Sequence, residues 1–217
     1  MNLFLILLIV IAYLLGSIPF GLLLAKAHGK DLRKIGSGNI GATNVSRALG
    51  KKWAYVCFAL DLAKGLVPMI IAKPLIGPNP QIGMLLLWIC VGTAAVLGHI
   101  FPIYLKFKGG KGMSTSLGIV LGLYPYYTIS GLIAFVVWVI CLKTWKYVSL
   151  ASIIASIVFP LALIISIIVI DSWQFVNLWP LIVIACFLMG LVIIRHVENI
   201  KRLIEGSENK ISSKKTS

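Results

Sequence analysis

The chain has 217 residues, of which 59% are hydrophobic, and its mean hydropathy is +1.01. Soluble domains are about 45–50% apolar, so this composition excludes an ordinary water-soluble domain and predicts a membrane protein. The net charge of +14 lies in the loops between apolar segments. Because the positive-inside rule accounts for that arrangement, the charge does not indicate a nucleic-acid partner.

Seven apolar segments follow one another and predict an all-α polytopic membrane protein with seven transmembrane helices. In chain order they are 3–25, 53–73, 82–105, 113–123, 126–142, 147–170 and 179–195. The fourth is too short to cross a bilayer alone, so we expect it to be tilted, broken or preceded by a re-entrant loop. The first lacks a basic leader and is expected to be retained. Together the segments predict one membrane domain, 1–205, followed by a short polar basic tail, 206–217.

The Lys and Arg residues are concentrated in alternate gaps between these segments. The basic gaps are 26–52, 106–112, 143–146 and 195–217, whereas the other gaps are almost uncharged. Because basic loops stay in the cytoplasm, the asymmetry predicts an N terminus outside and a C terminus inside. The basic gaps fall on one side only if the short fourth segment counts as a span. They also hold most of the Gly, Ser, Asn and His residues outside the spans, so we expect the chemistry on that face.

The first polar cluster is the glycine-rich segment 36–47, which has the sequence GSGNIGATNVSR. It contains G-x-G-x-x-G, but a dinucleotide site needs a preceding strand in a soluble βαβ unit. Glycine-rich backbone can still present N–H groups to an anion, as can a short helix that begins at Thr43 or Asn44 and ends before Gly50. Arg47 would bind phosphate oxygens bidentately. The alternative is a turn whose arginine only sets the membrane orientation.

The second cluster is the segment 106–112, which has the sequence KFKGGKG and precedes three hydroxyl residues. It is not a Walker A motif, because Gly112 follows Lys111 where that motif has Ser or Thr. Lysines on a glycine-rich loop can nevertheless cradle phosphate. The alternative is a loop whose charge only keeps it in the cytoplasm.

The third cluster follows the last apolar segment and has RHVENIKR at 195–202 and EGSE at 205–208. On a helix, His196, Asn199 and Arg202 would lie on one side, and Glu198 would pair with Arg202. The alternative is a helix end whose charged side chains extend to the membrane interface.

Other polar residues lie within the apolar segments. Asp61 and Lys64 are three positions apart, and charges at membrane depth are costly unless they are paired. They either neutralise each other or contact a substrate. His99 is expected to be a packed or hydrogen-bonded structural histidine. The four cysteines form no C-x-x-C pair, and no disulfide framework or metal site is predicted.

The three clusters, in this order, resemble those of the bacterial acyl-phosphate-dependent glycerol-3-phosphate acyltransferases, the PlsY family. The similarity covers nearly the whole chain and extends to further matching residues, which are 16–20 (GSIPF), 61–65 (DLAKG), Gly98, His99, Pro102 and Gly206. The resemblance implies a seven-helix protein of the bacterial plasma membrane whose catalytic loops face the cytoplasm. It also implies transfer of a fatty acyl group from acyl-phosphate to the 1-hydroxyl of glycerol-3-phosphate. The products would be lysophosphatidic acid and phosphate, in phospholipid biosynthesis.

The residues and the resemblance together predict a site that holds both substrates by their phosphates. The candidate catalytic residues are Ser37, Arg47, Lys111, His196 and Asn199. The candidate substrate- and phosphate-binding residues are Gly38, Asn39, Asn44, Lys108, Gly109, Gly110, Gly112, Thr115, Arg202 and Glu208. We expect the substrate hydroxyl to attack directly, with His196 or a substrate phosphate taking its proton. The expected partners are acyl-phosphate, glycerol-3-phosphate and membrane lipid, with no cofactor or metal, in a monomer.

Two other classes of protein stay open at this point. A transporter or channel for an anionic metabolite would need polar residues across the helix bundle and broken helices at its midplane. A membrane scaffold would not need the glycine–lysine loops. Because the polar residues gather on one face, the pattern favours an enzyme.

Overall fold

The computed structural model describes residues 2–77 and 80–211. Over these residues the secondary structure consists of ten α-helices and two short 3₁₀ helices, which confirms the predicted all-helical fold. The chain divides into two compact units, Met1–Tyr124 and Pro125–Ser217, and each is described by itself. The predicted tail residues 212–217 lie outside the described part of the chain.

Six helical stretches are long and apolar enough to cross a membrane. They are Leu3–Ala27, Lys51–Ile76, Ile82–Leu105, Tyr126–Trp145, Val148–Val169 and Phe175–Arg195. The predicted short segment 113–123 forms the apolar helix Met113–Gly122, which has 10 residues and is below spanning length. The structure therefore supports a polytopic membrane protein with six candidate spans, beside which it contains the shorter apolar helix Met113–Gly122.

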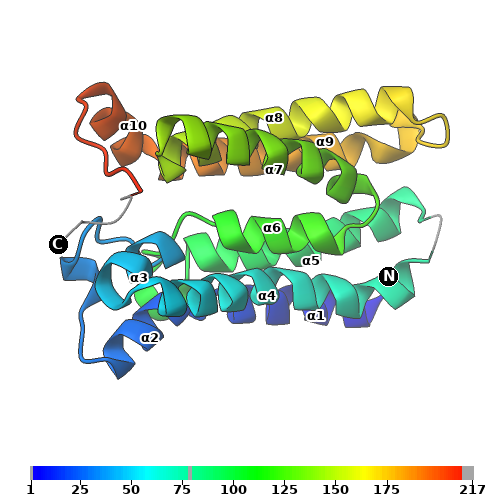
Figure 1. The fold of residues 1–217 in the computed structure, drawn as a ribbon. Helices are drawn as coiled ribbons and strands as arrows, with labels where there is room; N and C mark the ends of the chain where they lie inside the picture. Colours follow the sequence, from blue (N-terminus) through cyan, green and yellow to red (C-terminus); the bar gives the residue numbers. More distant parts are fainter. Residues whose placement is uncertain (1, 78–79, 212–217) are drawn as a thin grey trace. The chain divides into compact units, whose positions relative to one another are not determined.

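The first unit contains six α-helices and both 3₁₀ helices. Its α-helices are labelled α1 to α6 in Figure 1. In chain order these are α1 (Leu3–Gly16), α2 (Phe20–Ala27), η1 (Leu32–Lys34), α3 (Ala42–Leu49), α4 (Lys51–Ile76), α5 (Ile82–Ile100), η2 (Ile103–Leu105) and α6 (Met113–Gly122). Helix α1 packs along α5, and α4 packs along both α5 and α6.

The first apolar segment, predicted as a span over 3–25, matches the spanning stretch Leu3–Ala27, but it is made of two helices rather than one. Helix α1 ends at Gly16 and α2 begins at Phe20. Pro19 has no N–H group and disfavours helical backbone at Ile18, which explains the break. The carbonyl of Ile18, at the break, accepts a hydrogen bond from Lys64 Nζ at 2.9 Å. The buried cation thus provides a partner for a carbonyl at the point where the helix is interrupted.

Glycines allow the short helix α6 to lie directly against α4. A Cβ on Gly65 would overlap the carbonyl of Thr115, and a Cβ on Gly118 would overlap the carbonyl of Leu62. Small residues at such positions let membrane helices approach closely, where hydrophobic burial gives little driving force between helices. Helix α6 is therefore held in the unit by main-chain proximity despite its length.

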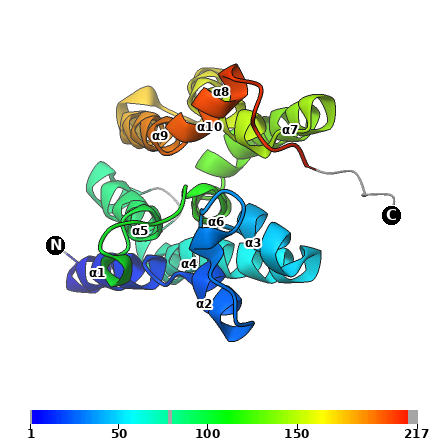
Figure 2. The same ribbon diagram turned by 90° about the vertical axis from the view of Figure 1, so that its left-hand side faces the viewer.

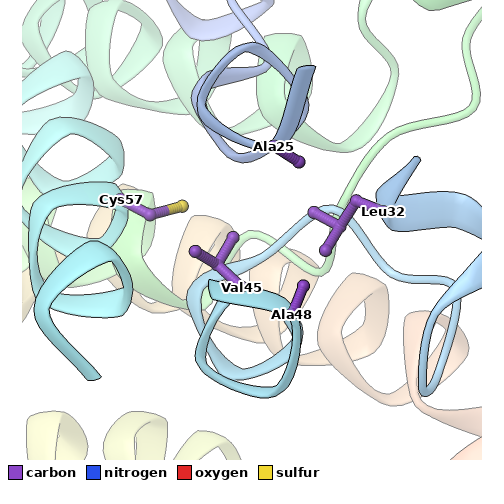
Figure 3. Packing of buried hydrophobic residues seen from close by; sticks show 5 residues of the cluster. All are labelled: Ala25, Leu32, Val45, Ala48 and Cys57. Atoms are coloured by element: carbon purple, nitrogen blue, oxygen red, sulfur yellow. The ribbon is translucent and has the colours of Figure 1, made fainter. Parts of the chain in front are cut away.

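A small apolar core supports the glycine-rich segment 36–47 of the first unit. It consists of one residue from α2, one from η1, two from α3 and one from α4 (Figure 3), which are Ala25, Leu32, Val45, Ala48 and Cys57. The two α3 residues are three positions apart and so share one face of that helix. Arg47 is exposed. The core thus orients α3 so that its arginine faces outward.

The second unit contains α7 (Tyr126–Trp145), α8 (Val148–Val169), α9 (Phe175–Arg195) and α10 (Val197–Ile204). Helix α8 packs along both α7 and α9. The hydroxyl of Tyr127, which is 1% exposed, donates to the carbonyl of Leu181 at 2.6 Å and joins α7 to α9. The predicted segments 126–142, 147–170 and 179–195 correspond to α7, α8 and α9.

Candidate active site

Asn44, in α3, is the centre of the hydrogen bonding in the glycine-rich segment. Its Oδ1 accepts from the N–H of Ser37 at 3.1 Å. Its Nδ2 donates to the carbonyls of Leu32, Ile35 and Asn39 at 3.0, 2.9 and 2.9 Å. The residue is 2% exposed. Asn44 was predicted to bind phosphate, but the structure uses its amide to fasten the preceding loop to α3.

Two glycines give this loop its shape. Gly36 and Gly38 have φ angles of 57° and 67°, in the left-handed region that favours glycine. A Cβ on Gly36 would overlap Asn44 Oδ1 and crowd Arg47 Cδ at 3.1 Å. The N–H of Gly38 donates to the carbonyl of Ile35 at 3.0 Å. The glycines therefore build a tight turn, rather than a continuous row of N–H groups for an anion.

Helix α3 begins close to its predicted position and supplies N–H groups of its own. It runs from Ala42 to Leu49, and Gly50 follows with φ 89°. Its N-cap residue is Gly41, which has no side chain to cap the helix, and Asn39 Oδ1 accepts from the N–H of Gly41 at 2.9 Å. The first N–H groups of a helix have no partner within it and favour an anion. Ser37 and Arg47, both exposed, belong to this same loop and helix.

The lysine loop, 106–112, is closed by its own main chain. The N–H groups of Gly109 and Gly110 donate to the carbonyls of Ile100 and His99 at 3.1 and 3.0 Å. A Cβ on Gly109 would overlap both carbonyls. These two N–H groups were expected to cradle phosphate, but they are already hydrogen-bonded within the protein. Glycine is needed at both positions because a side chain would overlap neighbouring atoms.

The cations of the lysine loop are presented outward from this turn. Lys108 is exposed and Lys111 is half-buried. Gly112, with φ 82°, precedes the first residue of α6. Thr115 was predicted to bind substrate, but it is fully buried and its Oγ1 donates to the carbonyl of Asp61 at 2.9 Å. The segments 36–47 and 106–112 lie at the same end of the first unit (Figure 2).

His196 marks the junction between α9 and α10 in the second unit. Its φ and ψ of −107° and 6° end one helix and begin the next, so the third cluster is not one continuous helix. Its Nδ1 lies 2.7 Å from the carbonyl of Val192. Because a carbonyl only accepts, Nδ1 carries the hydrogen, and in the neutral ring Nε2 is the basic nitrogen. The residue is 2% exposed.

Glu208 gathers three side chains of the second unit. Its Oε1 accepts from Asn199 Nδ2 at 2.9 Å and from Ser149 Oγ at 3.1 Å. Its Oε2 accepts from Arg202 Nε at 2.8 Å. Burial by itself raises the pKa of the Glu208 carboxyl, but these hydrogen bonds and the Arg202 charge outweigh it and hold the pKa below its ordinary value. Glu208 thus orients Asn199 and Arg202.

The predicted pairing of Glu198 with Arg202 is wrong. Glu198 lies 3.3 Å from Lys201, whereas Arg202 pairs with Glu208. The chain turns back after α10, and the N–H of Glu208 donates to the carbonyl of Arg202 at 3.1 Å. A buried carboxylate brought back by this turn competes better for the guanidinium than an exposed one on the helix.

Ser149 was not identified from the sequence. It lies 59 positions before Glu208, and no motif connects the two residues. The hydrogen bond between His196 and the carbonyl of Val192 could not be predicted from the sequence either, because every residue has a carbonyl. By contrast, Asp61 and Lys64 were expected either to neutralise each other or to contact a substrate, and the 2.8 Å between Lys64 Nζ and Asp61 Oδ1 agrees with the first alternative.

Comparison with known proteins gives a consistent result along the chain. The sequence model of the family "Glycerol-3-phosphate acyltransferase" matches residues 6–206. The glycerol-3-phosphate acyltransferase of Geotalea daltonii is 44% identical over 207 residues, covering 94% of this chain and 96% of the relative. That of Macrococcus caseolyticus is 44% identical over 210 residues, covering 96% and 98%.

Two solved structures are similar over the same extent. The crystal structure of PlsY, an integral membrane glycerol-3-phosphate acyltransferase, in its glycerol-3-phosphate form has a TM-score of 0.82, 42% identity and 96% coverage of each chain. Its lysophosphatidic acid form has a TM-score of 0.79 and 42% identity, covering 96% of this chain and 95% of that one. With the family match, these similarities show that the chain belongs to the glycerol-3-phosphate acyltransferase family.

Proposed function

We propose that this acyltransferase moves a fatty acyl group from acyl-phosphate to the 1-hydroxyl of glycerol-3-phosphate, forming lysophosphatidic acid and phosphate. A bond forms between the hydroxyl oxygen and the acyl carbon, and the bond from that carbon to the phosphate oxygen breaks. Family membership supports glycerol-3-phosphate as the acceptor. The observation that carries the proposal is the loop fastened by Asn44, which leaves Ser37 and Arg47 exposed beside the uncapped start of α3.

The first unit supplies cations for the phosphates of both substrates. Arg47 offers a planar guanidinium that grips phosphate bidentately, and Lys108 and Lys111 add point charges. Fixed cations aimed at the tetrahedral transition state lower its energy more than that of the ground state, because its oxygen has gained negative charge. The apolar helices beside these loops suit the acyl chain.

Direct attack by the substrate hydroxyl is the mechanism that fits the described residues. No imidazole or carboxylate among them is hydrogen-bonded to the Ser37 hydroxyl, so Ser37 lacks the neighbouring base that a covalent nucleophile needs. The proton of the attacking hydroxyl passes either to His196 or to a substrate phosphate oxygen. Acyl-phosphate is already activated, so its phosphate leaves without further protonation.

The proposal includes a membrane arrangement. Helix α6 counts as a seventh segment, the N terminus lies outside, and the catalytic loops face the cytoplasm of a bacterial plasma membrane. The support is the concentration of Lys and Arg in alternate loops. Residues 1–205 act as one membrane domain, and the polar segment 206–217 follows it.

The donor can be tested with the purified protein in detergent, glycerol-3-phosphate, and either palmitoyl-phosphate or palmitoyl-CoA. We expect glycerol-3-phosphate-dependent release of phosphate from palmitoyl-phosphate and no reaction with the thioester. Turnover with palmitoyl-CoA alone would contradict the proposed donor. Absence of acyl transfer from either donor would contradict the acyltransferase function itself.

A further inference from the structure

Three ionisable side chains form a buried cluster in the first unit that the acyl-transfer mechanism does not use. Asp61, Lys64 and His99 have side chains that are 3%, 4% and 5% exposed. We propose that His99, anchored by Asp61, is a positioning residue that sets the shape of the turn carrying Lys108 and Lys111. This inference rests on the proposed function, in which those lysines hold substrate phosphate.

Asp61 is fixed from several directions. Lys64 Nζ lies 2.8 Å from its Oδ1, and His99 Nδ1 lies 3.6 Å from the same oxygen. Cys57 Sγ donates to Oδ2 at 3.6 Å. Lys64 also donates to the carbonyl of Ile18, so the cluster is tied to the break between α1 and α2. Because a buried charge that loses its partner is strongly unfavourable, these contacts keep the carboxylate in one place.

His99 connects this anchor to the lysine loop. Its carbonyl accepts from the N–H of Gly110 at 3.0 Å. Its ring lies directly against the same glycine, because a Cβ on Gly110 would overlap Nε2 and approach the Cε1 and Cδ2 atoms of the ring at 2.9 and 3.0 Å. The ring thus has one edge near Asp61 and another beneath Gly110. A shift of the imidazole would move the turn immediately before Lys111.

Asp61 also holds the other end of the turn. Its main-chain carbonyl accepts from Thr115 Oγ1 at 2.9 Å, in the first turn of α6. The side chain of Asp61 therefore lies near His99, upstream of the lysine loop, and its backbone carbonyl holds Thr115, downstream of the loop. The segments on both sides of the loop thus contact the same residue of α4, Asp61.

The backbone of the loop requires such support. Lys106 and Phe107 have φ angles of 52° and 62°, which are unfavourable for residues other than glycine. Strained conformations of this kind persist only where the surroundings impose them. Since misplacing a catalytic group by roughly 1 Å can cost about 100-fold in rate, small changes at His99 should appear in turnover.

The ring contact gives a suppression test in the full-length protein. Gly110→Ala should lower kcat/KM for glycerol-3-phosphate by about 10- to 100-fold, because the new methyl group strikes the imidazole. His99→Asn keeps a donor near Asp61 and removes the far edge of the ring, so it should stay within about tenfold of wild type. The double variant should return to the level of His99→Asn.

Two matched controls separate positioning from general damage. Gly83→Ala places a methyl group on α5 where nothing among the described residues lies within 4 Å. Thr93→Val removes a buried hydroxyl of α5 that has no hydrogen-bond partner among the described residues. Both should keep wild-type kcat and KM. His99→Ala should alter kcat or KM of the folded fraction, measured beside its Tm, whereas a purely structural role would lower only the Tm.

The outcomes are distinct. Suppression of Gly110→Ala by His99→Asn supports the inference, because independent effects would multiply instead. Multiplying losses in the double variant, or wild-type kcat/KM in the folded fraction of His99→Ala, would overturn it. The assay of the wild-type protein tests the proposed function by itself: if the wild type transfers no acyl group, the proposed function is wrong whatever the variants do.

Discussion

The carboxylate of Glu208 lies 2.8 Å from Nε of Arg202, and this ion pair folds the segment after α10 back onto that helix. The same carboxylate holds the amide of Asn199, which is three positions from His196. Glu198, the acidic residue next to Asn199 in the sequence, pairs with Lys201 instead. An apparent tail residue therefore orients the third polar cluster.

The pH dependence of the second unit should reflect Glu208. Its pKa is lower in the folded protein than the unfolded value of about 4.3, so the unfolded chain binds the proton more tightly. The stabilisation is fully present above that unfolded value and is lost as pH falls through the folded pKa. We expect the Tm to decline below about pH 4, measured by thermal unfolding in detergent.

Glu208→Gln should remove much of this decline and lower the Tm at pH 7, because the neutral amide accepts weaker hydrogen bonds from Arg202. Glu205→Gln is the matched control, since Glu205 is exposed in the same segment. Equal pH profiles for the wild type and Glu208→Gln would contradict the role given to the carboxylate.

Asn44→Ala should unfold the loop that precedes α3. The change leaves the N–H of Ser37 and three carbonyls without their partner, at about 1–3 kcal/mol for each group that stays buried. We expect a lower Tm and nearly complete loss of acyl transfer. Asn44→Asp should also fail, since a carboxylate cannot donate to carbonyls. Asn209→Ala, at an exposed position, serves as the control.

Arg47→Lys should separate charge from geometry. Lysine keeps the positive charge but lacks the planar pair of donors that a guanidinium offers to phosphate. We expect kcat/KM to fall by about 100-fold, with the Tm unchanged because Arg47 is exposed. The same exchange at exposed Arg33, in the neighbouring 3₁₀ helix, should leave turnover intact. Similar turnover for both variants would remove Arg47 from the site.

Ser37→Ala tests direct attack. The main-chain bond from Ser37 to Asn44 is kept, so the variant should fold normally. We expect a loss of about 10- to 1,000-fold in kcat from the missing hydroxyl donor. Full activity would show that Ser37 is not used. An acyl group found on Ser37 after incubation of the wild type with labelled palmitoyl-phosphate would overturn direct attack in favour of a covalent route.

Local patterns predicted much of the helical structure. Hydrophobic length located α4, α5 and the three long helices of the second unit, and Gly50 correctly ended α3. The charge pair of Asp61 and Lys64 followed from the cost of isolated charges in a membrane. These features depend on neighbours within a few positions, which the sequence displays directly.

The hydrogen bonds that motif residues make within the protein could not be predicted in the same way. Asn44 and Thr115 were assigned to phosphate because they are polar and lie in motifs. Their actual partners are main-chain atoms, 12 and 54 positions away in the cases of Leu32 and Asp61. Backbone carbonyls carry no sequence signal, so only the fold shows which polar residues position a loop and which face outward.

The stoichiometry of the reaction tests the central claim most directly. Purified protein is incubated with palmitoyl-phosphate and glycerol-3-phosphate, and phosphate and lipid products are quantified together by colorimetry and mass spectrometry. We predict one lysophosphatidic acid for each phosphate released, and both in amounts that depend on glycerol-3-phosphate. Phosphate release that yields free palmitate without lysophosphatidic acid would contradict acyl transfer.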